Sequence, residues 1–158
     1  MPRQTTKIKN MNLLRRYKLP PCITINQDTY DRWLTRKARS VKQRGREQDS
    51  VDYGGLSIYK NAIHDAVCKS NGKDFFTGEQ LDWSLLSKWN NGEAKEGKSE
   101  YLRKFSFLPT VDHYDGRTKL NFVICSSKVN DAKNHMSHDE FLELCRKVIK
   151  HDEQKKTV

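Results

Sequence analysis

The sequence predicts an α+β fold in one domain, with helices flanking a strand–turn–strand–helix unit in the last third of the chain. A length of 158 residues suits a single domain. Apolar residues recur at helical spacing near both ends, and two short apolar runs flank a turn signal at Asp115-Gly116. Only 35% of the residues are hydrophobic and 32% are charged, so the core must be small.

The first quarter of the chain is expected to form a basic arm followed by a basic helix. Residues 1–25 contain Pro20-Pro21, which a helix interior does not tolerate, so we expect an arm that is loosely held or folds on a partner. A basic N-terminal helix is expected over 28–45, because apolar positions 30, 34, 38 and 41 share one face. The rest of the helix surface carries arginine and lysine.

Further elements follow from local signals. A second amphipathic helix is expected over 57–71, closed by Asn71-Gly72, and a short helix around 82–89. The polar, glycine-containing stretch Asn90–Ser99 predicts a surface loop. Trp33, Trp83 and Trp89 could stack nucleic-acid bases, but tryptophan at helical spacing is expected in the core or at its edge.

The last third is expected to contain the hairpin and two helices. Strands are predicted over Phe107–His113 and Leu120–Ile124, followed by a short helix that Ser126 or Ser127 caps and that runs through Lys133. Ser137 and Glu140 form a capping box that opens a final helix over 137–151. Residues 26–151 thus form one domain, and residues 152–158 form a polar tail that is expected to fray.

Charge is distributed unevenly along the chain. The net charge is +10, and residues 1–48 hold 13 basic and 3 acidic side chains, whereas residues 49–158 hold 17 of each. A basic block on a neutral body is typical of a polyanion binder, although a solvated basic face that keeps the protein soluble has the same composition. The candidate phosphate contacts are Arg32, Arg36, Arg39, Lys42, Arg44 and, in the hairpin turn, Arg117.

Several classes of protein are disfavoured. No apolar run approaches the roughly 18 residues of a membrane-spanning helix, and the polar start Met1-Pro2-Arg3-Gln4 does not resemble a secretory signal. We therefore expect a cytoplasmic protein without a membrane partner. The four cysteines are scattered and form no C-x-x-C pair, so we expect free buried thiols and no structural zinc.

The chemistry concentrates in the strand–turn–strand–helix unit. Asp112 and His113 end the first strand, Asn121 opens the second, and Asn130 lies on the helix. A carboxylate oxygen, an amide oxygen and a histidine that titrates near neutrality suit a Mg²⁺ or Mn²⁺ site with an adjacent base. Each residue alone has an ordinary explanation as a strand end, a cap or a turn. Their joint spacing is what indicates a site.

These residues resemble a known family. The runs P-T-V-D-H at 109–113 and N-F-V-I-C-S-S-K-V-N-D-A-K at 121–133 resemble the ββα-metal core of HNH endonucleases over about 107–134. F-T-G-E at 76–79 resembles a segment often found upstream of that core. The resemblance implies that His113 is the general base, that Asp112 and Asn130 hold Mg²⁺ or Mn²⁺, that Asn121 orients His113, and that Lys133 meets the phosphate.

The expected function is therefore a metal-dependent DNA endonuclease of HNH type with a ββα-metal core. The resemblance implies products with a 5′-phosphate and a 3′-hydroxyl. Double-stranded DNA is the expected partner, and cutting both strands needs a homodimer or two sequential nicks, because one site cuts one strand. Two alternatives stay open: a nucleic-acid-binding protein with an inactive HNH core, and a nuclease that acts on RNA or branched DNA.

Overall fold

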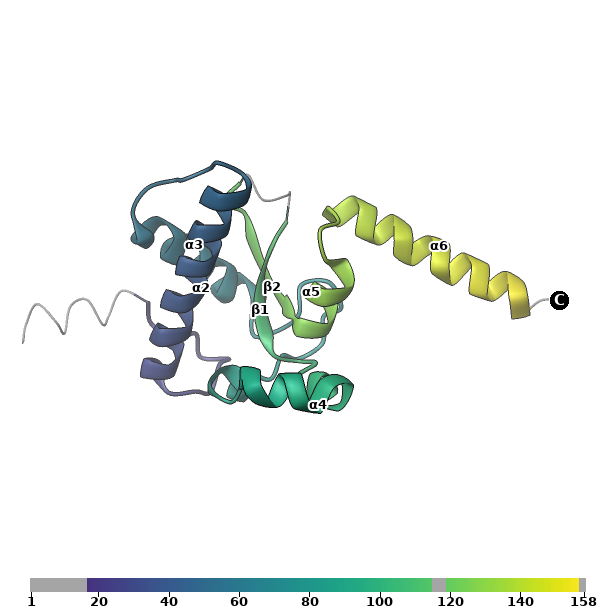
Figure 1. Cartoon of the computed structure of the whole chain (residues 1–158), viewed down its shortest axis with the longest axis horizontal. Helices are drawn as coiled ribbons and strands as arrows, with labels where there is room; N and C mark the ends of the chain where they lie inside the picture. Colours follow the sequence, from purple (N-terminus) through teal and green to yellow (C-terminus); the bar gives the residue numbers. More distant parts are fainter. Residues whose placement is uncertain (1–16, 115–118, 157–158) are drawn as a thin grey trace, which may run out of the picture.

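A computed structural model describes residues 17–114 and 119–156, which adopt an α+β architecture (Figure 1). Two antiparallel strands lie near the middle, with helices on both sides. The described elements, in chain order, are α2 (Gln27–Gln48), α3 (Leu56–Ser70), the 3₁₀ helix η1 (Trp83–Ser87), α4 (Asn91–Lys104), β1 (Pro109–His113), β2 (Phe122–Ser126), α5 (Ser127–Lys133) and α6 (His138–Lys156).

The predicted basic helix is α2, and it is longer than expected. The side chain of Asn26 caps it by accepting a hydrogen bond from the backbone N–H of Asp28 at 2.7 Å. Gly45 was expected to end the helix but lies inside it, and its carbonyl accepts from the N–H groups of both Asp49 and Val51. A Cβ at position 45 would lie 3.0 Å from the Val51 carbonyl oxygen, so this glycine allows the chain to fold back closely.

The core lies between α2, α3 and the hairpin. Trp33, Ile63 and Ile124 come from these three elements and are almost completely buried. Trp83 of η1 packs edge-on against Trp33 with ring centroids 5.8 Å apart. The core prediction is confirmed for these two tryptophans, whereas Trp89 is 37% exposed and lies at the edge.

The hairpin forms as predicted, with shifted boundaries. β1 and β2 pair antiparallel from Pro109 opposite Ser126 to His113 opposite Phe122. The first strand therefore starts two residues later than predicted, and the second starts and ends two residues later. Ser126, one of the two residues predicted to cap the following helix, serves both elements, because it is the last residue of β2 and the N-cap of α5.

The prediction of a loop over Asn90–Ser99 is wrong, because α4 occupies this stretch. Asn90 caps the helix by accepting from the N–H of Gly92 at 2.8 Å, and the N–H of Asn90 donates to the hydroxyl of Tyr101 at 2.7 Å. The rings of Tyr101 and Phe105 stack at 4.6 Å and are buried. Capping and packing outweigh the roughly 1 kcal/mol that a glycine costs in a helix.

The described end of the N-terminal arm, residues 17–25, is fastened to the body and is not loosely held. Ile23 is 3% exposed and belongs to the main core, and the Tyr17 hydroxyl donates to Asn61 of α3 at 2.9 Å. Residues 1–16 of the predicted arm lie outside the described residues. The four cysteines are free as expected, but of these only Cys125 is buried.

The final helix, α6, projects away from the body (Figure 1). The predicted capping box is confirmed, since the Ser137 N–H donates to the Glu140 carboxylate at 2.7 Å and the Glu140 N–H donates to the Ser137 hydroxyl at 3.3 Å. The helix continues to Lys156, so the prediction that fraying starts at 152 is wrong. An ion pair between Asp152 and Lys156 spans this last turn. No residue of α6 is buried. Among the described helices, none is long and apolar enough to cross a membrane.

Candidate active site

The end of β1 and the end of α5 meet at a small polar pocket of about 310 Å³. We call it the strand-end pocket. β1 contributes Asp112 and His113, α5 contributes Asn130 and Lys133, and α2 contributes Arg44. Its lining residues are Arg44, Val111, Asp112, His113, Asn130, Asp131, Lys133, Asn134, His135 and Met136. The sequence prediction therefore holds for the convergence of Asp112, His113, Asn130 and Lys133.

The local sequence explains why α5 folds back over β1. Ser126 ends β2 and its hydroxyl accepts from the N–H of Val129 at 3.4 Å, so the helix begins where the strand ends. The N–H of Ser127 donates to the Leu108 carbonyl at 2.9 Å. Val129 is 7% exposed. A seven-residue helix is too short to be stable alone, so these contacts position Asn130 and Lys133.

A buried aspartate that the sequence analysis missed holds this unit to the rest of the protein. Asp74 is 2% exposed. One of its carboxylate oxygens accepts from the N–H groups of Phe76 and Thr77 at 2.8 and 3.1 Å, and the other accepts from the N–H of Ser126 at 2.7 Å. Asp74 therefore fixes the turn before F-T-G-E and ties that turn to the junction of β2 and α5. Its position two residues before this run is a signal that could have identified it.

The pocket contains a buried ion pair. The Lys133 ammonium lies 3.0 Å from Asp112 Oδ2, and the two side chains are 4% and 10% exposed. This oxygen accepts no hydrogen bond of good geometry, so the contact is chiefly electrostatic. Asp112 Oδ1 accepts from the N–H of His113 at 2.9 Å. In this state the Asp112 charge is balanced by Lys133.

His113 is half-buried and lines the pocket. Its ring meets the ring of Phe122, its cross-strand partner, edge-on with centroids 5.0 Å apart. Its carbonyl accepts a long hydrogen bond from Lys133 Nζ at 3.4 Å. The side chain of His113 is therefore positioned by the hairpin itself while staying accessible to a molecule in the pocket.

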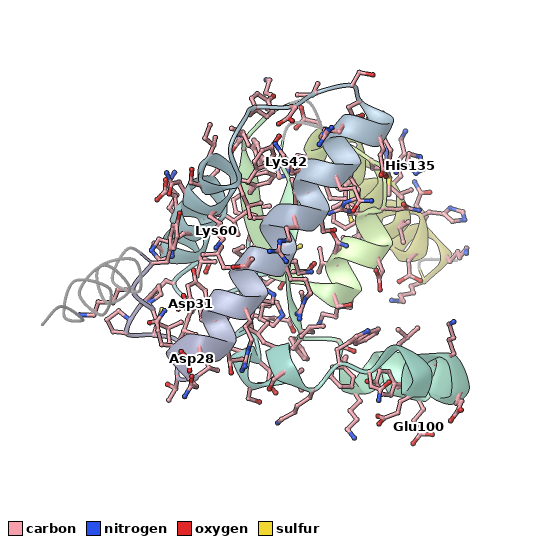
Figure 2. The ribbon with its side chains drawn as sticks, turned by 60° about the vertical axis from the view of Figure 1, so that its left-hand side comes forward. Asp28, Asp31, Lys42, Lys60, Glu100 and His135 are labelled. Atoms are coloured by element: carbon pink, nitrogen blue, oxygen red, sulfur yellow. The ribbon has the colours of Figure 1, made fainter. Side chains whose placement is uncertain are left out.

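Two further pocket residues were not predicted as parts of this site. Asp131 follows Asn130 directly and is exposed, and it adds a second carboxylate to the lining. His135 is also exposed and lies on the segment after α5, near the carboxyl end of α2 (Figure 2). Adjacency to Asn130 was the available signal for Asp131.

Asn121 lies apart from the strand-end pocket. It precedes β2, its carbonyl accepts from the N–H of Tyr114 at 3.0 Å, and it lines a separate pocket together with Phe75 and Phe122. The backbone contact closes the hairpin. Its predicted role in orienting the His113 ring stays a prediction. Arg117 lies outside the described residues.

The basic residues of α2 point in different directions. Arg44 reaches the strand-end pocket, and Arg36 lines a neighbouring hollow next to β1 and α5. Arg32 and Arg39 line a shallow pocket on the outer side of α2, together with Arg36.

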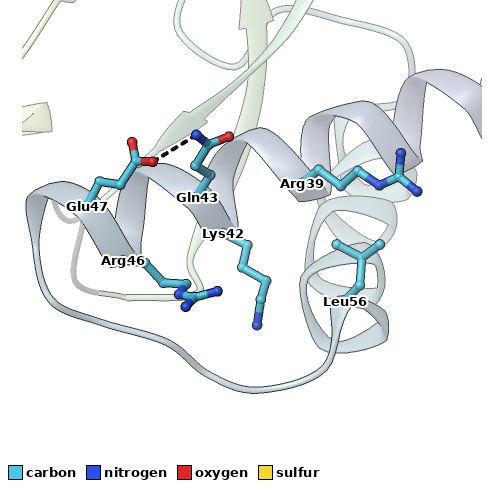
Figure 3. A pocket seen from close by; sticks show the side chains of 6 residues that line it. All are labelled: Arg39, Lys42, Gln43, Arg46, Glu47 and Leu56. Carbon is cyan, nitrogen blue, oxygen red and sulfur yellow. Dashed lines mark hydrogen bonds between the residues drawn. The ribbon is translucent and has the colours of Figure 1, made fainter.

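Lys42 lies on the side of α2 that faces α3 and is already engaged. Its ammonium pairs with Asp52 at 2.7 Å and donates to the Gly54 carbonyl. Figure 3 shows Lys42 beside Arg39, Arg46 and Leu56. Its contacts hold the loop between α2 and α3, so Lys42 is the least available of the five candidate phosphate contacts on α2.

Comparison with protein-family models, with curated proteins and with solved structures found no match to this chain. Function must therefore be argued from the pocket itself. The pocket combines carboxylate and amide oxygens, an accessible imidazole and two cationic side chains. Such a set can bind an anionic group and move a proton beside it.

Proposed function

We propose that this protein is a metal-dependent DNA endonuclease with an HNH-type ββα-metal core, in which β1, β2 and α5 form the core. The observation that carries the proposal is the convergence of Asp112, His113, Asn130 and Lys133 on one polar pocket that Arg44 borders. These side chains come from the end of one strand and from two helices, and a shared function is a reason for them to gather around one cavity.

The donor set fits a hard divalent cation in kind. Asp112 offers a carboxylate and Asn130 an amide oxygen, and Mg²⁺ commonly takes one or two protein oxygens and completes its shell with water and phosphate. Among the described residues, no group of three or more histidine, cysteine, aspartate or glutamate side chains gathers for a metal. Two protein oxygens of this kind suit Mg²⁺ or Mn²⁺ bound together with substrate.

A bound cation would withdraw charge from the scissile phosphate and stabilise the leaving oxygen. The protein's own groups supply the remaining steps. The His113 imidazole takes a proton from the attacking water. The Lys133 ammonium neutralises Asp112 and meets the incoming phosphate charge, while Arg44 holds the adjacent backbone at the rim of the pocket.

Binding of the nucleic-acid backbone is assigned to α2. Arg36 and Arg44 border the core side, and Arg32 and Arg39 extend the positive surface around the helix. Each phosphate contact releases condensed counterions, so affinity should fall steeply as salt rises. A single pocket cuts one strand, so double-strand cleavage requires two copies or two sequential events.

A second candidate is a nucleic-acid-binding protein without nuclease activity. The observation that favours it is the buried ion pair, because Lys133 occupies one side of the carboxylate that would ligate the cation. If that pair does not open when substrate and metal bind, Asp112 contributes structure only. Cleavage distinguishes the two candidates, since both predict binding.

The test is cleavage of supercoiled plasmid by the wild type, His113→Ala and His151→Ala, with Mg²⁺, Mn²⁺ or EDTA. His151 is an exposed histidine on α6 and serves as the matched control. We expect metal-dependent nicking that is lost in His113→Ala and retained in His151→Ala. Binding of every variant without cutting in any metal would reject the nuclease and favour the second candidate.

A further inference from the structure

A hollow of about 640 Å³ adjoins the strand-end pocket and shares Asn130 and Asp131 with it. It lies where α2, η1, α4, β1 and α5 meet, and we call it the tryptophan hollow after Trp89. Its lining includes Arg36, Lys37, Trp89, Leu102 and Thr110. A volume of this size is typical of small-molecule sites, and the nuclease chemistry proposed above does not account for it.

One wall of the tryptophan hollow is apolar and accessible. Trp89 is 37% exposed and Leu102 is 49% exposed. Trp89 is held in place by edge-on contacts with Tyr101 and Phe105, each at 5.2 Å between ring centroids. A fixed aromatic surface of this kind can stack a planar group without first losing side-chain entropy.

Two other lining residues of the hollow, Arg36 and Lys37, are cationic. The Lys37 ammonium is half-buried and donates to the Thr110 hydroxyl at 3.1 Å, and Arg36 is exposed beside it. Burial, together with the charges of Arg36 and Arg44, lowers the pKa of Lys37 to about 8. Among the described residues, no carboxylate lies within ion-pair distance of Lys37. A positive charge kept there without a carboxylate partner is one that a phosphate would stabilise.

We propose that the tryptophan hollow binds one unpaired nucleotide of the substrate strand, with its base against Trp89 and Leu102 and its phosphate at Arg36 and Lys37. The proposal rests on the proposed nuclease function and specifies the substrate class. Asn130 and Asp131 border both cavities, so the strand would pass from the hollow directly to the strand-end pocket.

This arrangement selects against intact duplex. A paired base is stacked on both faces and must be flipped out before it reaches the hollow, which costs a few kcal/mol. Single-stranded, frayed or branched DNA already presents such a base. The protein should therefore prefer DNA with an unpaired nucleotide beside the cut over continuous duplex.

The test is equilibrium binding in EDTA, so that it does not depend on cleavage. A labelled single-stranded oligonucleotide and its duplex are titrated with wild type, Trp89→Ala, Arg36→Gln and the control Arg46→Gln. Arg46 lines the pocket that Lys42 and Leu56 border (Figure 3) and not the tryptophan hollow. We expect Trp89→Ala to weaken single-strand binding about tenfold, in line with base–aromatic stacking, and duplex binding by less than about twofold.

Arg36→Gln keeps the test valid if Trp89→Ala disturbs α4, because Arg36 is exposed. It should weaken single-strand binding more than Arg46→Gln does. Equal affinities of the wild type and both hollow variants for the single strand would overturn the proposal that the hollow binds a nucleotide. Equal losses of affinity for single strand and duplex would overturn it as well. Cleavage that fails in every metal while the Trp89-dependent preference persists would instead reject the nuclease and leave the binding site intact.

The helix α6 presents apolar side chains to solvent. Its 19 residues extend about 28 Å, anchored at one end where His138 and Phe141 contact Phe76. Beyond this anchor the apolar side chains are open to solvent, with Leu144, Val148 and Ile149 at 45%, 61% and 57% exposure. With Cys145 they form a stripe at the spacing of a two-helix seam.

The charges along α6 indicate what covers this stripe. Residues 138–145 hold three acidic side chains and no lysine or arginine, whereas residues 146–156 hold five lysines and arginines and two acidic side chains. Two copies packed antiparallel place the acidic half of one against the basic half of the other. We infer that α6 pairs antiparallel with α6 of a second copy. A helix of about five turns buries less surface than the roughly 1,600 Å² of a typical protein–protein interface. The dissociation constant of the dimer should therefore lie in the micromolar range.

Sedimentation equilibrium of the full chain under reducing conditions tests the pairing. Wild type and the polar-face control Gln154→Ala should associate as concentration rises, and the double variant Val148→Gln/Ile149→Gln should stay monomeric. Raising the salt concentration should weaken the wild-type association, because the pairing is charge-complementary. A wild type that stays monomeric at about 500 µM, a double variant that associates like wild type, or an association that salt strengthens would overturn the antiparallel dimer.

Discussion

Replacing Lys37 by methionine should make the protein more stable and a weaker DNA binder. Lys37 lies on α2 with its ammonium half-buried against β1. Burial is the main reason that its pKa falls from 10.5 to about 8, and the charges of Arg36 and Arg44 add to it. The folded state therefore holds this charge at a cost that the unfolded chain does not bear. Methionine keeps most of the volume and removes the charge.

The magnitude follows from the pKa. A fall from 10.5 to about 8 corresponds to about 3 kcal/mol at about 1.4 kcal/mol per pH unit. Loss of the hydrogen bond to Thr110 destabilises the variant by about 1 kcal/mol. Lys37→Met should therefore gain about 2 kcal/mol in the free energy of unfolding at pH 7.

The gain should depend on pH in a defined direction. Below pH 8 Lys37 is charged in both states and the full penalty applies. Between pH 8 and about 10.5 the folded state has released the proton while the unfolded state still holds it, so wild-type stability rises relative to the variant. Above that range the penalty is gone, and methionine keeps no advantage from it.

Urea unfolding followed by tryptophan fluorescence at pH 7 and pH 9.5 measures this difference. Lys42→Met is the matched control on the same helix, since it removes the pair with Asp52 and should give no gain. A Lys37→Met protein that is less stable than wild type at pH 7, or a gain that is the same at both pH values, would refute the reasoning.

Three further predictions concern single residues. Asp74→Ala should lower the free energy of unfolding by about 3 kcal/mol, because three N–H groups, of which that of Ser126 is buried, lose a charged acceptor. A loss under about 1 kcal/mol by urea unfolding would contradict this. Burial lowers the pKa of His64, which contacts the Tyr30 hydroxyl at 2.7 Å. Stability should therefore fall as the pH drops below about 6.5. In His64→Gln the melting temperature should depend less on pH. Arg44→Gln should weaken DNA binding and reduce its salt slope by about 1, and an unchanged slope would place Arg44 away from phosphate.

Local signals predicted much of the fold because they act within a few residues. The spacing of Tyr30, Leu34 and Ala38 predicts the buried face of α2, and the Ser137–Glu140 box predicts the start of α6. The turn between the two apolar runs predicts the hairpin. The ends of elements were less predictable, as at Gly45, which lies inside α2 and accepts from the N–H groups of Asp49 and Val51.

The sequence analysis did not predict helix α4 or the role of Asp74, because both depend on contacts with residues distant in the sequence. α4 reads as a loop from its glycines, and what stabilises it is the packing of Tyr101 and Phe105 with Leu85. Asp74 reads as an ordinary turn residue, and its importance comes from Ser126, 52 positions later. The site was predictable because its spacing encodes the same hairpin and helix that bring its residues together. The tryptophan hollow was not predictable from the sequence, because five elements must assemble before Trp89 and Lys37 line the same cavity.

The buried ion pair decides which substitutions can report on catalysis. Breaking a pair that is 4% and 10% exposed leaves one buried charge without a partner, which typically costs about 3–5 kcal/mol. Activity lost in Lys133→Ala or Asp112→Ala would therefore mix lost chemistry with lost folding. His113→Ala removes the edge-on ring contact with Phe122 but leaves the Asp112–Lys133 pair in place. Its loss of cleavage therefore reports on the proton transfer more directly than a loss in Asp112→Ala or Lys133→Ala.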